Sequence, residues 1–231
     1  AKAWRWVAVT AAVTALVVRL SRSRAAFADP AGPTPPVLTT DRYAVYDHLS
    51  GDRRQVCGAH LRRDFQAMIG RANGGSGIGT DLLLHADILL DQRKRVRDGT
   101  LTRRGFRQTY LGWLRAEVRD LLTNGAASTC PKTAGACREI LAAELSLWTF
   151  ARVDGVEPTS NAAERAVRHA VCWRKTSDGT DSEAGSRFAE RVPTVVASCR
   201  QQGRDVLAFL VDAVQAARTG TAVPSLVPAG V

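Results

Sequence analysis

Two stretches decide the fold: WRWVAVTAAVTALVVRL at residues 4–20 and VLTTD at residues 37–41. The first contains two runs rich in β-branched and aromatic side chains, residues 4–10 and 14–20, separated by a linker of three residues. This pattern predicts two adjacent antiparallel strands. The second stretch predicts a short buried strand that places Asp41 at its C-terminal end.

The segment between these stretches completes the topology. Residues 21–28 are expected to form a short helix, and the turn-rich DPAGPTPP at residues 29–36 ends it. A strand pair, a short helix and then a strand ending in aspartate is the order of a ribonuclease-H-like α/β core. In such cores, carboxylates on neighbouring elements converge to hold two divalent cations. We therefore predict an α/β fold of this type.

The rest of the chain is predicted to be helical. The helical periodicity indicates helices at 55–69, 82–97, 102–122, around Cys137 to Trp148, from Asn161 onward, at 188–199 with an interruption at Pro193, and at 206–217. Residues 73–79 are expected to form a flexible break, and Tyr43 and Tyr46 a helical turn. The predicted organisation is a first core part (1–79), a helical insertion (80–150), a second core part with the C-terminal helices (151–218) and a loose tail (219–231).

Composition limits the functional class. Of 231 residues 45% are hydrophobic, which supports a real core and excludes a disordered chain or a membrane protein. The net charge is +10, and 28 of the 32 basic residues are arginine. Because guanidinium binds phosphate in a bidentate manner, this balance favours nucleic acid, although an arginine-rich proteome gives the same composition.

The cysteines and the first residues bear on localisation. Five scattered cysteines without paired spacing predict reduced thiols, and hence a cytoplasmic protein. The apolar run at 6–18 has some features of an export signal, but it is too short to span a bilayer and three arginines follow it. We expect no membrane partner.

Two acids are the candidate catalytic and metal-binding residues, Asp41 and Glu164. Hard cations such as Mg²⁺ require oxygen ligands, which carboxylates provide. Each acid also has an ordinary structural explanation. Asp41 could be a turn residue, and Glu164 could form a capping box with Asn161 or an ion pair with Arg168.

Several motifs carry a family resemblance. They are TDRY at 40–43 with Tyr46, RQVCGAHLRRDF at 54–65, EPT at 157–159 with NAAERAVR at 161–168, WRK at 173–175, GT at 179–180 and SEAGSRF at 182–188. Their order from Trp4 to about Ala217 resembles that of insertion-sequence 66 family transposases.

The resemblance implies a DDE (Asp-Asp-Glu) catalytic domain, with Asp41 as the second carboxylate and Glu164 as the third. It further implies two Mg²⁺ (or Mn²⁺) ions in the intact enzyme, metal-dependent DNA strand cleavage, and attack of the freed 3′-hydroxyl on target DNA. The expected partners are the insertion-sequence ends, target DNA and further copies of the chain in an active homo-oligomer. Residues 80–150 then become the helical insertion between the two acids.

The sequence also departs from the family pattern. The family's first aspartate lies on a strand before Trp4, and residues 1–10 contain no acid. The chain begins at Ala1 in mid-pattern, so we expect a truncated chain whose first strand is missing and whose activity is absent or impaired. Gly58 replaces a usual tryptophan and Ser160 a usual asparagine, and Pro193 is expected to kink its helix.

Cys57 and His60 share a face of the predicted helix. Similar pairs in other DDE transposases imply that they support the active site, a role we also expect for Asn161. A packed thiol and imidazole, or half of a zinc site, remain alternatives.

Basic and aromatic residues near the acids are the candidate DNA contacts: Arg62, Arg63, Arg165, Arg168, Trp173, Arg174 and Lys175. Lys175 would orient a phosphate and Trp173 would stack on an unpaired base. Further clusters at 93–97 and 103–107 could bind phosphates or form a solvated face, whereas Trp113 and Trp148 are expected in the core. Two other functions remain open, a non-catalytic DNA-binding remnant and a small helical zinc protein built on Cys57 and His60.

Overall fold

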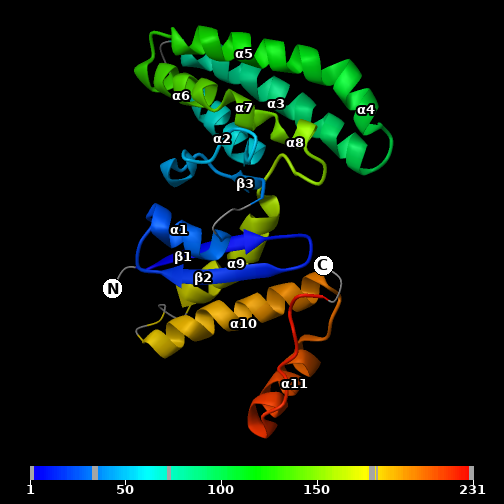
Figure 1. Ribbon diagram of the computed structural model, residues 1–231. Coiled ribbons are helices and arrows are strands. Elements are labelled where there is room, and N and C mark those ends of the chain that lie inside the picture. Colours follow the sequence, from blue (N-terminus) through cyan, green and yellow to red (C-terminus); the bar gives the residue numbers. More distant parts are fainter. Residues whose placement is uncertain (1–2, 33–35, 72–73, 177–179, 181, 229–231) are drawn as a thin grey trace. The chain divides into compact units, whose positions relative to one another are not determined.

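The computed structural model describes residues 3–32, 36–71, 74–176, 180 and 182–228 (Figure 1). The chain is a mixed α/β protein that is mostly helical. It divides into two compact units, described separately below. The ribbon unit comprises residues 1–34 and 161–231, and the helical unit comprises residues 35–160.

An antiparallel strand pair forms the centre of the ribbon unit. Strand β1 (Trp4–Val9) pairs with β2 (Thr14–Arg19), so that Trp4 lies opposite Arg19 and Val9 opposite Thr14. The side chain and backbone of Thr10 close the turn by hydrogen bonds to Val13. The predicted strand pair is confirmed.

Helices cover both faces of this strand pair. Helix α1 (Arg24–Ala31) lies on one face, where the ring of Phe27 is 6.0 Å from that of Trp6. Helix α9 (Asn161–Thr176) packs against β1, and α10 (Glu183–Gln201) packs against β2 (Figure 1). Helix α11 (Val206–Thr219) follows α10 after a turn at Gly203.

Two proline-based expectations are wrong. Helix α1 continues through Pro30 to Ala31 instead of ending before it, and α10 continues through Pro193 without interruption. A proline removes one main-chain hydrogen bond. Near the end of α1 that loss affects only the last turn, and α10 is anchored on β2 on both sides of Pro193.

The anchoring consists of side chains that complete the outer edge of β2. Alternate N–H groups of this strand donate to side chains spaced four residues apart on α10, which are neighbours on one helix face. The bonds join Val18 to Glu190 (2.6 Å), Leu16 to Thr194 (2.9 Å) and Thr14 to Ser198 (3.1 Å). The edge is thus covered and cannot pair with another strand.

The described residues after α11, 220–228, form no helix. Among them, the carbonyls of Ser225 and Leu226 accept hydrogen bonds from Arg204 and Gln202, which lie in the turn between α10 and α11. These contacts hold part of the segment that was expected to be loose.

A parallel strand pair opens the helical unit. Strand β3 (Leu38–Thr40) pairs with β4 (Arg54–Val56), and a 3₁₀ turn at Ala44–Tyr46 lies between them. The predicted strand before Asp41 and the turn at the tyrosines are confirmed. The helix predicted from residue 55 instead begins at Gly58, as α2 (Gly58–Ile69), because Gln55 and Val56 belong to the fully buried β4.

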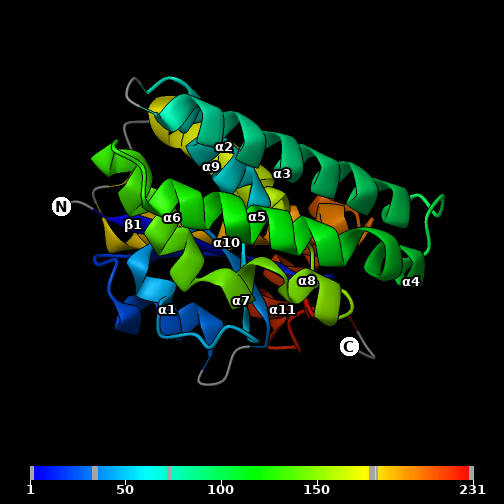
Figure 2. The ribbon, with the colours of Figure 1, turned by 90° about the horizontal axis from the view of Figure 1, so that it is seen from above.

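Long helices form the rest of this unit. They are α3 (Gly75–Arg97), α4 (Arg103–Phe106), a π-helical turn (Arg107–Leu111), α5 (Gly112–Ala126), α6 (Pro131–Ala142), α7 (Glu144–Leu147) and α8 (Thr149–Arg152). Helix α2 packs on α3, α3 on α5, and α5 on α6 (Figure 2). Residues 75–79 of the expected flexible break are helical, and the single helix expected up to Trp148 is divided at Ala143 and Trp148.

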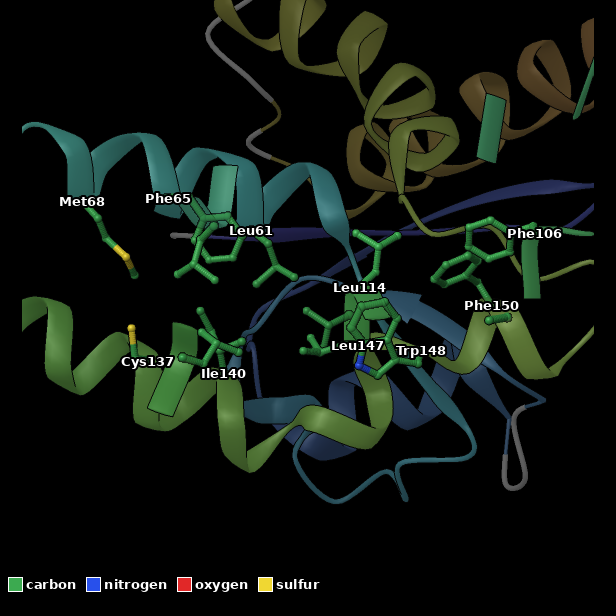
Figure 3. Packing of buried hydrophobic residues seen from close by; sticks show 14 residues of the cluster. Leu61, Phe65, Met68, Phe106, Leu114, Cys137, Ile140, Leu147, Trp148 and Phe150 are labelled. Atoms are coloured by element: carbon green, nitrogen blue, oxygen red, sulfur yellow. The ribbon is translucent and has the colours of Figure 1, made fainter. Parts of the chain in front are cut away.

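The hydrophobic core lies between these helices. Leu61, Phe65 and Met68 of α2 face Cys137 and Ile140 of α6 (Figure 3). Trp148 is buried, as predicted. Trp113 is 41% exposed and sets its ring at a steep angle to that of His85, so the prediction of a core tryptophan is wrong there.

No helix in the described residues has the length and apolar character needed to cross a membrane.

Candidate functional site

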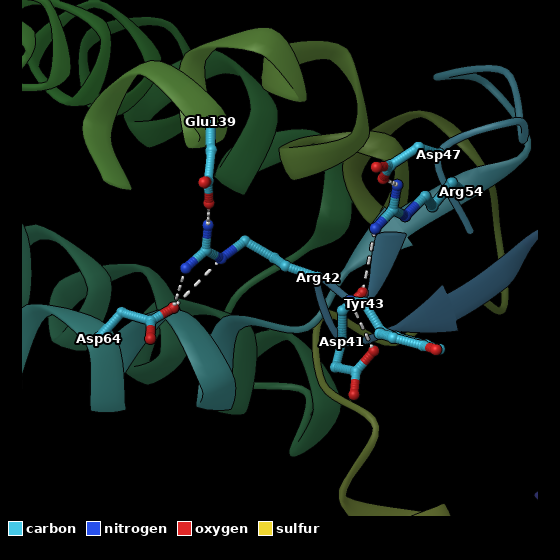
Figure 4. Close-up of polar contacts among 7 residues, drawn as sticks. All are labelled: Asp41, Arg42, Tyr43, Asp47, Arg54, Asp64 and Glu139. Carbon is cyan, nitrogen blue, oxygen red and sulfur yellow. Dashed lines mark hydrogen bonds and ion pairs between the residues drawn. The ribbon is translucent and has the colours of Figure 1, made fainter. Parts of the chain in front are cut away.

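Asp41 lies directly after β3, where its side chain organises a turn. Its Oδ1 accepts a hydrogen bond from the Tyr43 N–H at 3.0 Å, and its main-chain carbonyl accepts one from the Thr40 hydroxyl at 2.9 Å. Among the described residues, Oδ2 receives no hydrogen bond (Figure 4). Asp41 is therefore a turn residue, as the structural alternative held, and it also keeps one carboxylate oxygen for a ligand.

Arg54 holds this turn from within β4. Its buried guanidinium donates to the Thr40 hydroxyl at 3.1 Å and to the main-chain carbonyl of Asp41 at 3.1 Å. It also forms an ion pair of 2.9 Å with Asp47 and lies over the ring of Tyr46. Sequence reasoning missed Arg54. The available signal was a charged residue directly before the strand-like Gln55-Val56, but those residues were assigned to a helix.

Arg42 ties the same turn to two helices. Its guanidinium lies between Asp64 of α2, at 2.8 Å, and Glu139 of α6, at 3.0 Å. Figure 4 shows that the guanidinium group of Arg42 points to Asp64 and Glu139 and that of Arg54 points to Asp47, while the Asp41 carboxylate lies apart from both guanidinium groups. The Asp41 carboxylate thus forms no ion pair with either neighbouring arginine.

Cys57 joins the end of β4 to the segment that leads into α9. Its main-chain N–H donates to the Thr40 carbonyl at 2.8 Å, and its fully buried Sγ accepts a hydrogen bond from the Ser160 N–H at 3.1 Å. The Gly58 N–H donates to the Pro158 carbonyl at 2.8 Å. The start of α2 therefore fixes the backbone just before Asn161, and His60 follows in the first turn of α2.

Glu164 and the neighbouring cations lie on α9 of the ribbon unit. Glu164 is in the first turn and is exposed, as are Arg165 and Arg168. Trp173 is 37% exposed and packs against Phe188 of α10, with the ring centroids 6.3 Å apart. Asp41 belongs to the helical unit, so its meeting with Glu164 stays a prediction.

The structure divides the predicted basic clusters. Arg62 pairs with Asp87, whose hydrogen bond raises the pKa of the guanidinium, while Arg63 is exposed. Arg93 pairs with Glu157 at 2.8 Å. In the cluster at 103–107, both Arg103 and Arg107 donate to main-chain carbonyls at the end of α8. Arg62, Arg93, Arg103 and Arg107 therefore have structural partners, and Arg95 donates to the side chain of Gln92 at 2.9 Å. Lys94, Arg97 and Arg104 are exposed.

Comparison with known proteins identifies the class. The chain matches the description "Transposase IS66 family" over residues 1–188, and it belongs to that family. The family resemblance inferred from the sequence motifs is thus confirmed. The family consists of DDE-type transposases, a class of enzymes that acts on DNA and generally uses divalent metal ions.

Among individual proteins, the chain is 30% identical over 188 residues to the uncharacterized protein y4qI of Sinorhizobium fredii. The alignment covers 75% of this chain and 34% of that protein, so the chain spans about a third of its relative's length. No solved structure matches the chain.

Proposed function

We propose that the chain is the catalytic part of a DNA transposase that cuts and joins strands at the ends of an insertion sequence. The family match over residues 1–188 is the observation that carries this proposal. The order of strand pair, helix α1 and a strand ending at Asp41 supports the ribonuclease-H-like core expected for such an enzyme.

In this proposal Asp41 and Glu164 hold divalent ions, Mg²⁺ or Mn²⁺. Both residues offer oxygen ligands, which suit hard cations, and Asp41 keeps Oδ2 outside its turn hydrogen bond. Exposure of Glu164 lets it reach a ligand. Two bound ions would supply Lewis-acid stabilisation of the attacking and leaving oxygens at the phosphorus.

Other residues position these acids and the DNA. Arg54 holds the Asp41 turn, and the thiol of Cys57 holds the backbone that enters α9, which favours the supporting role over a zinc site. The exposed cations of α9, with Arg63, would bind backbone phosphates. Assembly as a homo-oligomer on DNA, a cytoplasmic location and the helical insertion at 80–150 are parts of the same proposal.

We assign no residue of this sequence to the first carboxylate of a DDE site. The 231-residue chain alone is therefore expected to bind metal and DNA, with strand cleavage absent or severely impaired.

The test is binding of a labelled DNA duplex, followed by fluorescence anisotropy, with Mn²⁺ and with EDTA. The proposal expects Mn²⁺ to strengthen binding by about tenfold, because ions held by the carboxylates contact the phosphates. Glu164→Gln should abolish this gain and leave the binding in EDTA unchanged.

Glu183→Gln is the matched control, since Glu183 is also exposed and also lies in the first turn of its helix. DNA binding that depends on salt but is indifferent to Mn²⁺ would favour a non-catalytic DNA-binding remnant. Nicking by the purified chain that Asp41→Ala abolishes would contradict the expected impairment.

A further inference from the structure

Arg5 occupies an unusual place for a cation, on the face of β1 that α9 covers. Successive strand residues point to opposite faces. Trp6 packs against Phe27 of α1, so Arg5 points to the other face, where α9 packs against β1. Its cross-strand neighbour there is Val18. The guanidinium thus emerges among apolar strand residues beneath a helix.

The charge of Arg5 has no counter-charge among the described residues. Its Nε is buried and makes no hydrogen bond, and no carboxylate there forms an ion pair with it. Burial, together with the nearby positive charge of Arg174, holds the pKa of Arg5 below its usual range. A buried donor without a partner and a second cation beside it both destabilise the free protein.

The position of Arg174 is favourable for a cation even without a ligand, whereas that of Arg5 is not. It lies in the last turn of α9, where the helix dipole favours cations. It is exposed and makes no hydrogen bond within the described part of the chain. An anion that accepts hydrogen bonds from both arginines would supply the missing counter-charge.

We propose that Arg5 and Arg174 form a binding site for one phosphate group of a DNA strand. The site adds a strand residue, Arg5, to the DNA contacts expected of α9, and in that respect it rests on the proposed function. Guanidinium forks match phosphate oxygens in geometry, and the anion would neutralise both cations. DNA binding would relieve an electrostatic strain that is built into the free ribbon unit.

Two effects of opposite sign test the site. Arg5→Met removes the unpartnered charge, so the DNA-free chain should melt about 2–4 °C higher. The same change should weaken DNA binding by about tenfold and lower the slope of log K against log salt by about 0.9, the value for one phosphate. A purely structural arginine would not give higher stability together with weaker binding.

The matched control is Arg24→Met, which removes the same charge from an exposed position at the start of α1. It should leave the melting temperature unchanged and weaken DNA binding far less than Arg5→Met does. Arg174→Met, at an exposed position, provides a second variant. It should weaken DNA binding as Arg5→Met does, and the double variant should be no weaker than either single one.

Binding of inorganic phosphate tests this site independently of the proposed function in DNA transposition. It should raise the melting temperature of the unchanged chain, and this gain should vanish in both Arg5→Met and Arg174→Met. A chain that gains stability from phosphate through these arginines but binds no DNA would retain the anion site and contradict the transposase proposal. Equal DNA binding by Arg5→Met and Arg24→Met would overturn the proposed site. So would a lower melting temperature of Arg5→Met, if phosphate also still raised the melting temperature of Arg174→Met.

Discussion

Replacing Arg54 by methionine should loosen the turn that carries Asp41. The change removes hydrogen bonds to the Thr40 hydroxyl and the Asp41 carbonyl, each worth about 1 kcal/mol net. The ion pair with Asp47 adds about 0.5 kcal/mol, because the Asp47 side chain is 63% exposed and solvent screens it. Methionine fills most of the buried stem, so the cavity adds little.

The free energy of unfolding should therefore fall by about 2–3 kcal/mol, a large share of the total stability of a domain. Urea unfolding followed by tryptophan fluorescence measures this change. Arg53→Met is the control, since Arg53 is the adjacent residue, is exposed, and its side chain makes no hydrogen bond within the described residues. Its effect should stay within about 0.5 kcal/mol. Equal effects of the two variants would refute the role given to Arg54.

Two further predictions concern the helical unit. A Cβ added at Gly79 would lie 2.8 Å from the backbone of α2, so Gly79→Ala should lower the free energy of unfolding by about 2 kcal/mol even after the gain in helix propensity. Gly77 has open space around it, so Gly77→Ala should raise the free energy of unfolding by up to about 1 kcal/mol in the same urea assay. Stabilisation by both changes would contradict the close packing of α2 on α3. Although burial alone would raise it, hydrogen bonds and charges from Arg115 and Arg119 hold the pKa of Glu144 below its usual range. The resulting stabilisation of the fold is complete above about pH 5 and is lost as the pH falls through the lowered pKa. Glu144→Gln should therefore lower the free energy of unfolding at pH 7 and make it depend less on pH in the acid range. An unchanged pH profile of unfolding would count against the ion pair.

The sequence predicted the local elements where one signal dominated. Runs of β-branched and aromatic residues predicted β1 and β2, the short run before Asp41 predicted β3, and the helical pattern from Asn161 onward predicted α9. The start of α2 was misplaced because the buried Gln55 and Val56 fit either period when β4 is only three residues long. Prolines were overestimated as helix ends, since Glu190 and Ser198 accept hydrogen bonds from N–H groups of β2 and so hold α10 on both sides of Pro193.

The candidate site was predictable residue by residue but not in its supporting contacts. Asp41, Glu164 and Cys57 stood out through their motifs. The clamp by Arg54 and the unpartnered Arg5 depend on which side of a strand each side chain faces and on what packs there. Similarly, nothing in the spacing of Arg103 and Arg107 distinguished carbonyl capping of α8 from phosphate binding.

The proposed site requires that Asp41 and Glu164, 123 positions apart in the sequence, bind the same divalent ions. A double-mutant cycle of Mn²⁺ affinity tests it most directly, with Asp41→Asn, Glu164→Gln and the double variant measured by electron paramagnetic resonance. Each single change should weaken Mn²⁺ binding by at least about tenfold, and the double change should cost far less than the two effects combined. Fully additive effects, or unchanged affinity in either single variant, would mean that the two carboxylates do not share a site.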